Sequence, residues 1–131
     1  MKRTLHITGE NNSSLILDIL NNDSEYMKAE LALKADWLNA TINIEVSIER
    51  IKEFAIQLGK ALNNRDGSVT LINEEGNMDL TLELETAGKV IVRGILSKNM
   101  IEDNQAIFSF ESDYHSLTNL NDDINSFLDN L

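Results

Sequence analysis

One short segment of the sequence contains the three residue types of a nucleophilic catalyst. The segment Asp113-Tyr114-His115-Ser116 holds a carboxylate, an imidazole and a hydroxyl in four consecutive residues. A catalytic nucleophile, its base and an orienting group must lie within hydrogen-bond reach, and known triads assemble them from distant segments. We therefore interpret the segment as a loop whose Asp and Ser cap the last helix. His6, the other histidine, is interpreted as a surface residue, and we predict that the protein is not an enzyme.

A pair of carboxylates for glycoside hydrolysis could be drawn from four acidic residues, Asp79, Glu83, Glu85 and Glu111. The acid of such a pair needs an apolar environment that raises its pKa. Alternation of apolar and polar residues places these carboxylates on the polar side of predicted strands. We interpret them as surface residues rather than as catalysts.

Two segments are rich in oxygen ligands that could bind calcium, namely 74–79 and 119–123. Neither matches the spacing of an EF-hand loop. A structural zinc site needs several Cys or His ligands at set spacing, whereas the chain has no cysteine and two histidines. We predict neither a metal nor a cofactor.

The composition is typical of one soluble globular domain. A chain of 131 residues with 42% hydrophobic and 25% charged residues is expected to form a single domain over residues 1–131. No segment approaches the roughly 20 apolar residues of a membrane span. The absence of cysteine fits a reducing compartment. We expect a cytoplasmic protein.

The negative charge is concentrated in the second half of the chain. Residues 1–65 hold nine acidic and eight basic residues, whereas residues 66–131 hold 13 acidic residues and only Lys89, Arg93 and Lys98 as bases. Such a field repels nucleic acid and anionic membranes and attracts basic proteins. The alternative interpretation is a solvated surface that keeps the protein soluble.

Alternation with a period of two residues predicts eight antiparallel strands, each with one apolar face. The alternating segments are residues 5–7, 15–19, 27–37, 40–46, 69–71, 78–84, 90–96 and 106–110. In the third of them, Trp37 is predicted to continue the buried face, and Leu38-Asn39 is predicted to form the following turn.

Two segments have helical spacing instead. Ile48 to Leu62 carries one apolar stripe, with Ser47 as the expected cap, and Leu117 to Leu131 carries another, with Ser116 or Thr118 as the expected cap. The predicted fold is therefore α+β, with the order ββββα-ββββα. We expect one curved antiparallel sheet, or two sheets, covered by two helices.

One face of the predicted second half combines isoleucines with carboxylates. Apolar positions surrounded by like charges suit an interface with a basic partner. The predicted partner-binding residues are Asp79, Glu83, Glu85, Glu111, Asp113, Ile91, Ile95 and Ile107, with Ile72 on the same face. The alternative is that a helix or a second copy of the chain covers the isoleucines.

The order and spacing of these elements resemble the WapI-type immunity protein family of bacterial contact-dependent toxin systems. The resemblance spans roughly residues 27–131. It is carried by Phe54-x3-Leu58-x3-Leu62, by Gly67-x-Val69-x-Leu71, by the hairpin of Leu80–Leu84 and Gly88–Gly94, and by Phe108-x-Phe110-Glu111-x-Asp113 leading to Leu117.

The resemblance implies a cytoplasmic protein that binds and blocks a cognate toxin domain of the nuclease type. The partner would be a basic protein, because a nuclease must attract phosphates. A non-catalytic acidic binding or structural module of unrelated purpose, which could dimerise through the isoleucine face, is the alternative.

Overall fold

The computed structural model describes residues 3–98 and 104–131, which form two four-stranded antiparallel sheets, each followed by a helix. The predicted α+β class and the order ββββα-ββββα are confirmed. The first sheet and its helix are β1 (Thr4–Thr8), β2 (Ser14–Asn22), β3 (Tyr26–Ala35), β4 (Leu38–Ser47) and α1 (Ile48–Asn64), with a short 3-10 helix η1 (Glu10–Asn12) after β1. The second sheet and its helix are β5 (Gly67–Ile72), β6 (Met78–Leu84), β7 (Lys89–Ser97), β8 (Gln105–Asp113) and α2 (Tyr114–Asp129).

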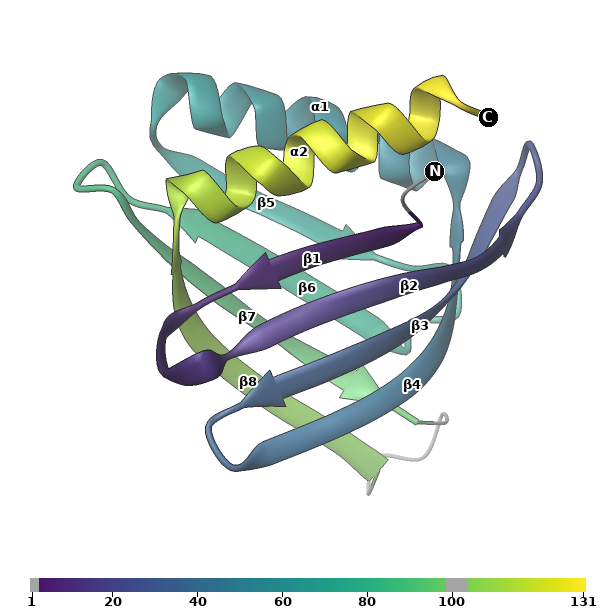
Figure 1. Cartoon of the computed structure of the whole chain (residues 1–131), viewed down its shortest axis with the longest axis horizontal. Helices are drawn as coiled ribbons and strands as arrows, with labels where there is room; N and C mark the ends of the chain where they lie inside the picture. Colours follow the sequence, from purple (N-terminus) through teal and green to yellow (C-terminus); the bar gives the residue numbers. More distant parts are fainter. Residues whose placement is uncertain (1–2, 99–103) are drawn as a thin grey trace.

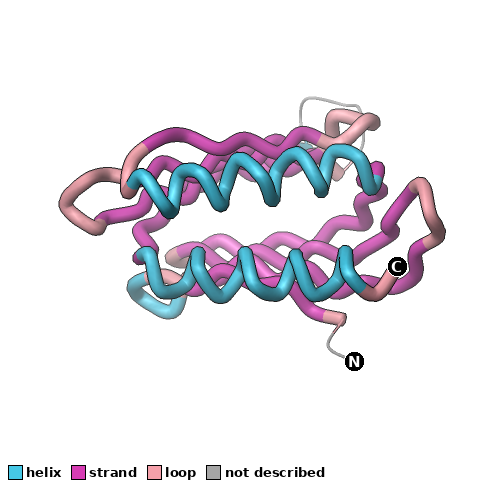
Figure 2. Tube along the Cα trace, turned by 90° about the horizontal axis from the view of Figure 1, so that it is seen from above, coloured by secondary structure: helices cyan, strands magenta, loops and turns pink. Residues whose placement is uncertain are grey.

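The two sheets face each other with their strands crossed, and the two helices lie side by side along one open side of the sandwich (Figure 1). Seen from above, α1 runs along the second sheet and α2 along the first (Figure 2). The helices contact the edge strands, α1 against β5 and α2 against β1. The helices therefore close the core at one side and leave the outer faces of both sheets uncovered.

The buried side chains form one continuous cluster that draws on both sheets and both helices. In each strand, alternate residues point inward, as shown by the strictly alternating burial of β6 from Met78 to Leu84. Leu31, Leu58, Leu82 and Leu117 each have at most 1% of their surface exposed. The helices can be stable because their apolar stripes are part of this cluster.

Both helices begin at a capping side chain. The Ser47 hydroxyl accepts a hydrogen bond from the Arg50 amide, as predicted. Asp113 caps α2, as the interpretation of the segment from Asp113 to Ser116 predicted, and its carboxylate accepts from the Ser116 amide at 2.8 Å, whereas the alternative prediction of Ser116 or Thr118 as the cap was wrong. The Ser116 hydroxyl is instead used in a tertiary contact, since it accepts from the Thr8 amide at 3.0 Å.

The turn between β3 and β4 lies earlier than the sequence indicated. Asp36 and Trp37 form it, with Asp36 in the left-handed region at φ 58°, and Leu38 already pairs with Ala35. Trp37 is therefore not a core residue, and 85% of its surface is exposed. Asp tolerates this backbone conformation better than most residues do, which makes the tight two-residue turn accessible here.

A buried asparagine connects the two sheets. The side chain of Asn73, which is 1% exposed, donates to the Glu45 carbonyl of β4 at 3.2 Å and accepts from the Met78 amide of β6 at 3.0 Å. Asn77 extends the connection by donating to the Asn43 carbonyl at 3.1 Å. Among the described helices, neither has the length and apolar character needed to cross a membrane.

Candidate protein-binding face

The outer face of the second sheet brings most of the predicted partner-binding residues together. Residues directly opposite each other on neighbouring strands project to the same side of a sheet. The register aligns them in two rows across the strands, which we call the isoleucine row (Ile72, Asp79, Ile95 and Ile107) and the glutamate row (Glu83, Ile91 and Glu111). Asp113 ends β8 opposite Lys89, and Glu85 lies at the β6–β7 turn.

The glutamate row is largely charge-compensated within the chain. Arg93 lies 2.5 Å from Glu83 and Lys89 lies 2.8 Å from Glu111, measured between nitrogen and carboxylate oxygen. The hydrogen bond and charge of Lys89 lower the pKa of Glu111, and Glu111 in turn raises the pKa of Lys89. Exposed ion pairs of this kind contribute little to stability, but they reduce the negative field that a partner would meet.

Glu10 joins this end of the face from the first half of the chain. Its carboxyl lies beside Glu111, in a shallow depression lined also by Gly9 and Asp113. Partial desolvation, then the hydrogen bond and charge of Glu111, raise the pKa of Glu10. The charges of Glu10, Glu111 and Lys89 therefore influence one another's pKa.

The isoleucine row is more exposed and lacks this compensation. Ile72, Ile95 and Ile107 are 41%, 36% and 70% exposed, so the alternative in which a helix covers them is wrong. Asp79, which is half-buried between them, forms no ion pair with any residue in 3–98 or 104–131. The row therefore presents an apolar surface with one uncompensated carboxylate.

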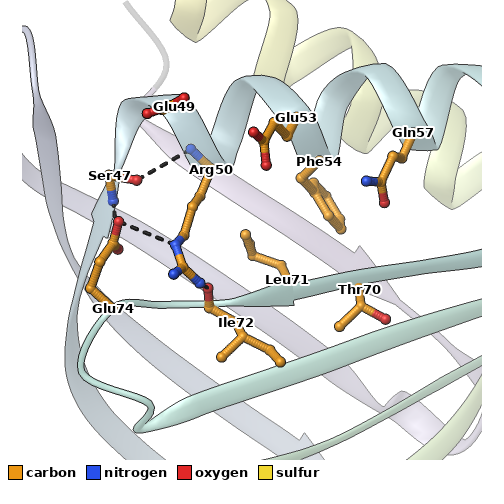
Figure 3. A pocket seen from close by; sticks show the side chains of 10 residues that line it. All are labelled: Ser47, Glu49, Arg50, Glu53, Phe54, Gln57, Thr70, Leu71, Ile72 and Glu74. Atoms are coloured by element: carbon orange, nitrogen blue, oxygen red, sulfur yellow. Dashed lines mark hydrogen bonds and ion pairs between the residues drawn. The ribbon is translucent and has the colours of Figure 1, made fainter.

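A polar groove of about 580 Å³ adjoins this face between α1 and the edge strand β5 (Figure 3). Its floor includes Phe54 and Leu71, and Glu49 and Glu53 line it from the helix. The isoleucine row reaches it at Ile72. The groove and the outer face therefore share Ile72.

Arg50 and Glu74 fasten the helix to the sheet inside this groove (Figure 3). The Arg50 guanidinium lies 3.2 Å from the Glu74 carboxylate and also donates to the Ile72 carbonyl. Glu74 accepts from the Ser47 amide at 3.1 Å. Partial burial opposes ionisation of Glu74, but the hydrogen bonds from Ser47 and the charge of Arg50 outweigh it and lower the pKa.

The two segments considered for calcium have other structural roles. In the segment 74–79, Glu74 binds Arg50, whereas Asp79 lies on the outer face of β6. The segment 119–123 belongs to α2 rather than to a loop. Within the described residues, no group of three or more His, Cys, Asp or Glu side chains is arranged to hold a metal ion.

The segment from Asp113 to Ser116 does not assemble into a hydrogen-bonded triad in this structure. The Asp113 carboxylate caps α2, and the Ser116 hydroxyl accepts from the Thr8 amide. His115 is exposed, and its ring nitrogen lies 3.4 Å from the Asn119 amide nitrogen. The interpretation that Asp113 caps the last helix therefore agrees with the geometry. His6 is half-buried on β1, opposite Ile16 on the first sheet.

Sequence reasoning missed Trp37 as a functional candidate, because the alternation of β3 extends to it without a break. The Asp36-Trp37 turn projects it beside β8. Together with Ile107 it lines a groove of about 370 Å³, whose other lining residues are Ala35, Asp36, Leu38, Gln105, Ala106, Phe108 and Ser109. The presence of Asp directly before Trp was the available signal, because Asp favours turns.

Comparison with known proteins identifies both the family and the fold. The sequence model of the Immunity protein WapI-like family matches residues 6–131. No curated protein sequence gives a significant match. The structure is similar to MRP1/MRP2 of Trypanosoma bruciei, with a TM-score of 0.59, 10% sequence identity, and coverage of 98% of this chain and 84% of that one. A chain of the CdiA-CT/CdiI toxin and immunity complex from Enterobacter cloacae matches with a TM-score of 0.48, 13% identity, and coverage of 93% and 99%.

Proposed function

The chain belongs to the WapI-like immunity protein family, and on this premise we propose that it binds a cognate toxin domain and blocks its activity. The observation that carries the proposal is the family match over residues 6–131. In this proposal the protein acts by occupying the toxin and performs no chemistry of its own. It would meet the toxin in the cytoplasm, where it needs neither a metal nor a cofactor.

The charge of the chain supports a toxin of the nuclease type. A nuclease binds phosphates and therefore presents a basic surface. The chain carries a net charge of −11, and an acidic inhibitor can mimic phosphates and associate rapidly through electrostatic steering. The proposed partner is accordingly a basic protein domain.

We place the toxin on the outer face of the second sheet. This face combines exposed isoleucines with carboxylates, and neither helix covers it. Its predicted contacts are Asp79, Glu83, Glu85, Glu111, Asp113, Ile91, Ile95 and Ile107. The two bases Lys89 and Arg93 compensate part of this charge, so the five carboxylates leave a local net charge of −3.

Co-expression tests the proposed function. The probe is the C-terminal domain of a large secreted protein encoded directly beside this chain, produced from an inducible promoter in a bacterium. The proposal predicts that the domain stops growth, that co-expression of this chain restores growth, and that an unrelated immunity protein does not. Titration calorimetry with an inactivated toxin domain should then show a complex. Growth arrest that this chain fails to relieve, together with no heat of binding, would reject the proposal.

The exposure of the isoleucine row favours a second candidate, a non-catalytic module that dimerises through this face. Ile107 is 70% exposed and lies at the edge strand β8. Sedimentation at several concentrations distinguishes the two candidates. A monomer at the highest concentration removes the dimer, whereas a concentration-dependent dimer that Ile107→Glu dissociates would support it.

A further inference from the structure

The apolar groups of the outer face are not scattered but continue from the second sheet to the first. Ile72, Ile95 and Ile107 occupy one register row across β5, β7 and β8. At the β8 end, Ile107 shares a groove with Trp37, which the turn after β3 contributes. The two most exposed large apolar side chains of the described residues, at 85% and 70%, therefore line the same groove.

The exposed side chain of Trp37 does not serve to pack the core. With 85% of its surface in contact with solvent, it contributes little to the core. Tryptophan is the residue type most enriched at the energetic centres of protein interfaces, and its indole provides a large apolar area with an N–H donor. The tight turn fixes the backbone from which the indole projects.

The carboxylate in the isoleucine row differs from those of the glutamate row. Glu83 and Glu111 already have cationic partners within the chain. Asp79 has no ion-pair partner among residues 3–98 and 104–131, and it lies in the isoleucine row itself. A cation brought by a partner would gain more from Asp79, because no ion pair with a described residue must be broken first.

We propose that the partner docks by inserting an apolar side chain into the groove between Trp37 and Ile107, while a lysine or arginine of the same partner pairs with Asp79. This inference rests on the proposed function and specifies which part of the outer face supplies the binding energy. The occupant is a basic toxin domain, which the negative charge of the chain favours, rather than a second copy, which carries the same net charge of −11. The glutamate row then steers association but contributes little to the affinity.

The test measures binding of an inactivated toxin domain to the intact chain by calorimetry. Trp37→Ala and Ile107→Ala are each expected to raise the dissociation constant about thirtyfold, and Asp79→Asn about tenfold. The matched controls are Ile56→Ala, which removes an equally apolar side chain that is 60% exposed on α1, and Glu30→Gln, which neutralises an exposed carboxylate on β3 of the first sheet. Both controls should bind within about threefold of the unmodified chain. Thermal unfolding of each variant shows whether it has folded.

A site-specific readout keeps the inference separate from the proposed function. Trp37 is the only tryptophan, so fluorotryptophan incorporated into this chain gives one fluorine NMR resonance that reports on the groove. The expected result is a shift of that resonance when the toxin domain binds and no shift when this chain alone is concentrated. Toxin binding with an unshifted resonance and unchanged variants would overturn the inference and leave the proposed function standing. No binding by the unmodified chain would overturn both, and a shift caused by self-association would identify a second copy as the occupant.

Discussion

Asp79 on β6 lies directly opposite Ile95 on β7, on the outer face of the second sheet. The pairing places a carboxylate that forms no ion pair with the described part of the chain within a row of exposed isoleucines. Four residues further along β6, Glu83 lies opposite Ile91 and forms an ion pair with Arg93. The outer face is therefore divided into an apolar row and a charge-compensated row, and the two rows are expected to contribute differently to binding.

Reversing the charges in and beside the glutamate row should change the rate at which the partner associates. Changing Glu83, Glu85 and Glu111 together to Lys is expected to lower the association rate constant about tenfold at low salt and to weaken its salt dependence, because charges at an interface rim mainly steer encounter. The dissociation rate should change little. Stopped-flow or surface-based kinetics at several salt concentrations measure both rates. An unchanged association rate in a folded variant would show that the toxin does not approach this face.

Lys89 should control the titration of Glu111. In Lys89→Met, the carboxyl of Glu111 loses the hydrogen bond and the charge that lower its pKa, so its titration midpoint should move upward. Carbon-detected NMR of the Glu side chains measures this shift, and Lys52→Met, on the exposed side of α1, is the control. A Glu111 midpoint that stays in place would contradict the observed ion pair.

The ion pair of Lys89 and Glu111 determines whether the unfolding free energy rises or falls as the pH is lowered. A carboxyl whose pKa is lowered in the folded state contributes stability above its unfolded pKa, and this contribution is lost as the pH falls through the folded pKa. For Glu111 and Glu74, whose pKa values are both lowered from 4.5, the loss should occur below pH 4.5. Denaturant unfolding between about pH 6 and pH 3 should show a decrease in stability that is shallower in Lys89→Met. An equal decrease in unfolding free energy in the unmodified chain and in Lys89→Met would contradict the assignment of this pH dependence to Glu111.

Asn73 should be important for stability, because its buried side chain makes three hydrogen bonds, one of which reaches β4 of the first sheet. Asn73→Ala leaves the Met78 amide and the Glu45 carbonyl without these partners and is expected to cost about 2–3 kcal/mol of unfolding free energy. Asn39→Ala, an exposed asparagine on β4, should cost less than about 0.5 kcal/mol. Urea unfolding of both variants checks the difference, and equal losses would refute this role of Asn73.

Two glycines should respond oppositely to the same substitution. A Cβ at Gly94 would lie 2.3 Å from the Asp79 carbonyl oxygen and 3.0 Å from the Phe108 ring, so Gly94→Ala must move the backbone of β6 or β7 and destabilise the sheet. A Cβ at Gly59, in the middle of α1, would meet only the Asn121 amide nitrogen at 3.7 Å. Gly59→Ala should therefore stabilise the protein by about 0.5–1 kcal/mol. Thermal or urea unfolding that ranks the two variants in the reverse order would contradict the packing around Gly94.

The sequence predicts the strands, the helices and the buried face of each strand apart from Trp37, because alternation and helical spacing depend only on local geometry. It does not distinguish one curved sheet from two, since β4 and β5 would show the same alternation whether or not they were hydrogen-bonded to each other. The ion pairs of Glu83 and Glu111 also escaped prediction. They depend on which residues of β6, β7 and β8 stand opposite each other, and the register is set by the hairpin turns.

The corrections at Trp37 and Ser116 arise from tertiary or backbone effects of single residues. At Trp37, a turn two residues earlier than expected separates the residue from the buried face. The Ser116 hydroxyl does not cap α2 but accepts from the amide of Thr8, which is 108 residues away in the chain. Local patterns carry no information about such a distant partner.

The most direct test of the account is a methyl NMR footprint of this chain in complex with the inactivated toxin domain. Isoleucine methyl groups report on every relevant surface, because Ile72, Ile91, Ile95 and Ile107 lie on the outer face of the second sheet, Ile16 on that of the first sheet, and Ile56 on α1. The account predicts perturbation of the four isoleucines of the second sheet, strongest at Ile107, with Ile16 and Ile56 unchanged. A complex that perturbs Ile16 or Ile56 and leaves these four unchanged would contradict it.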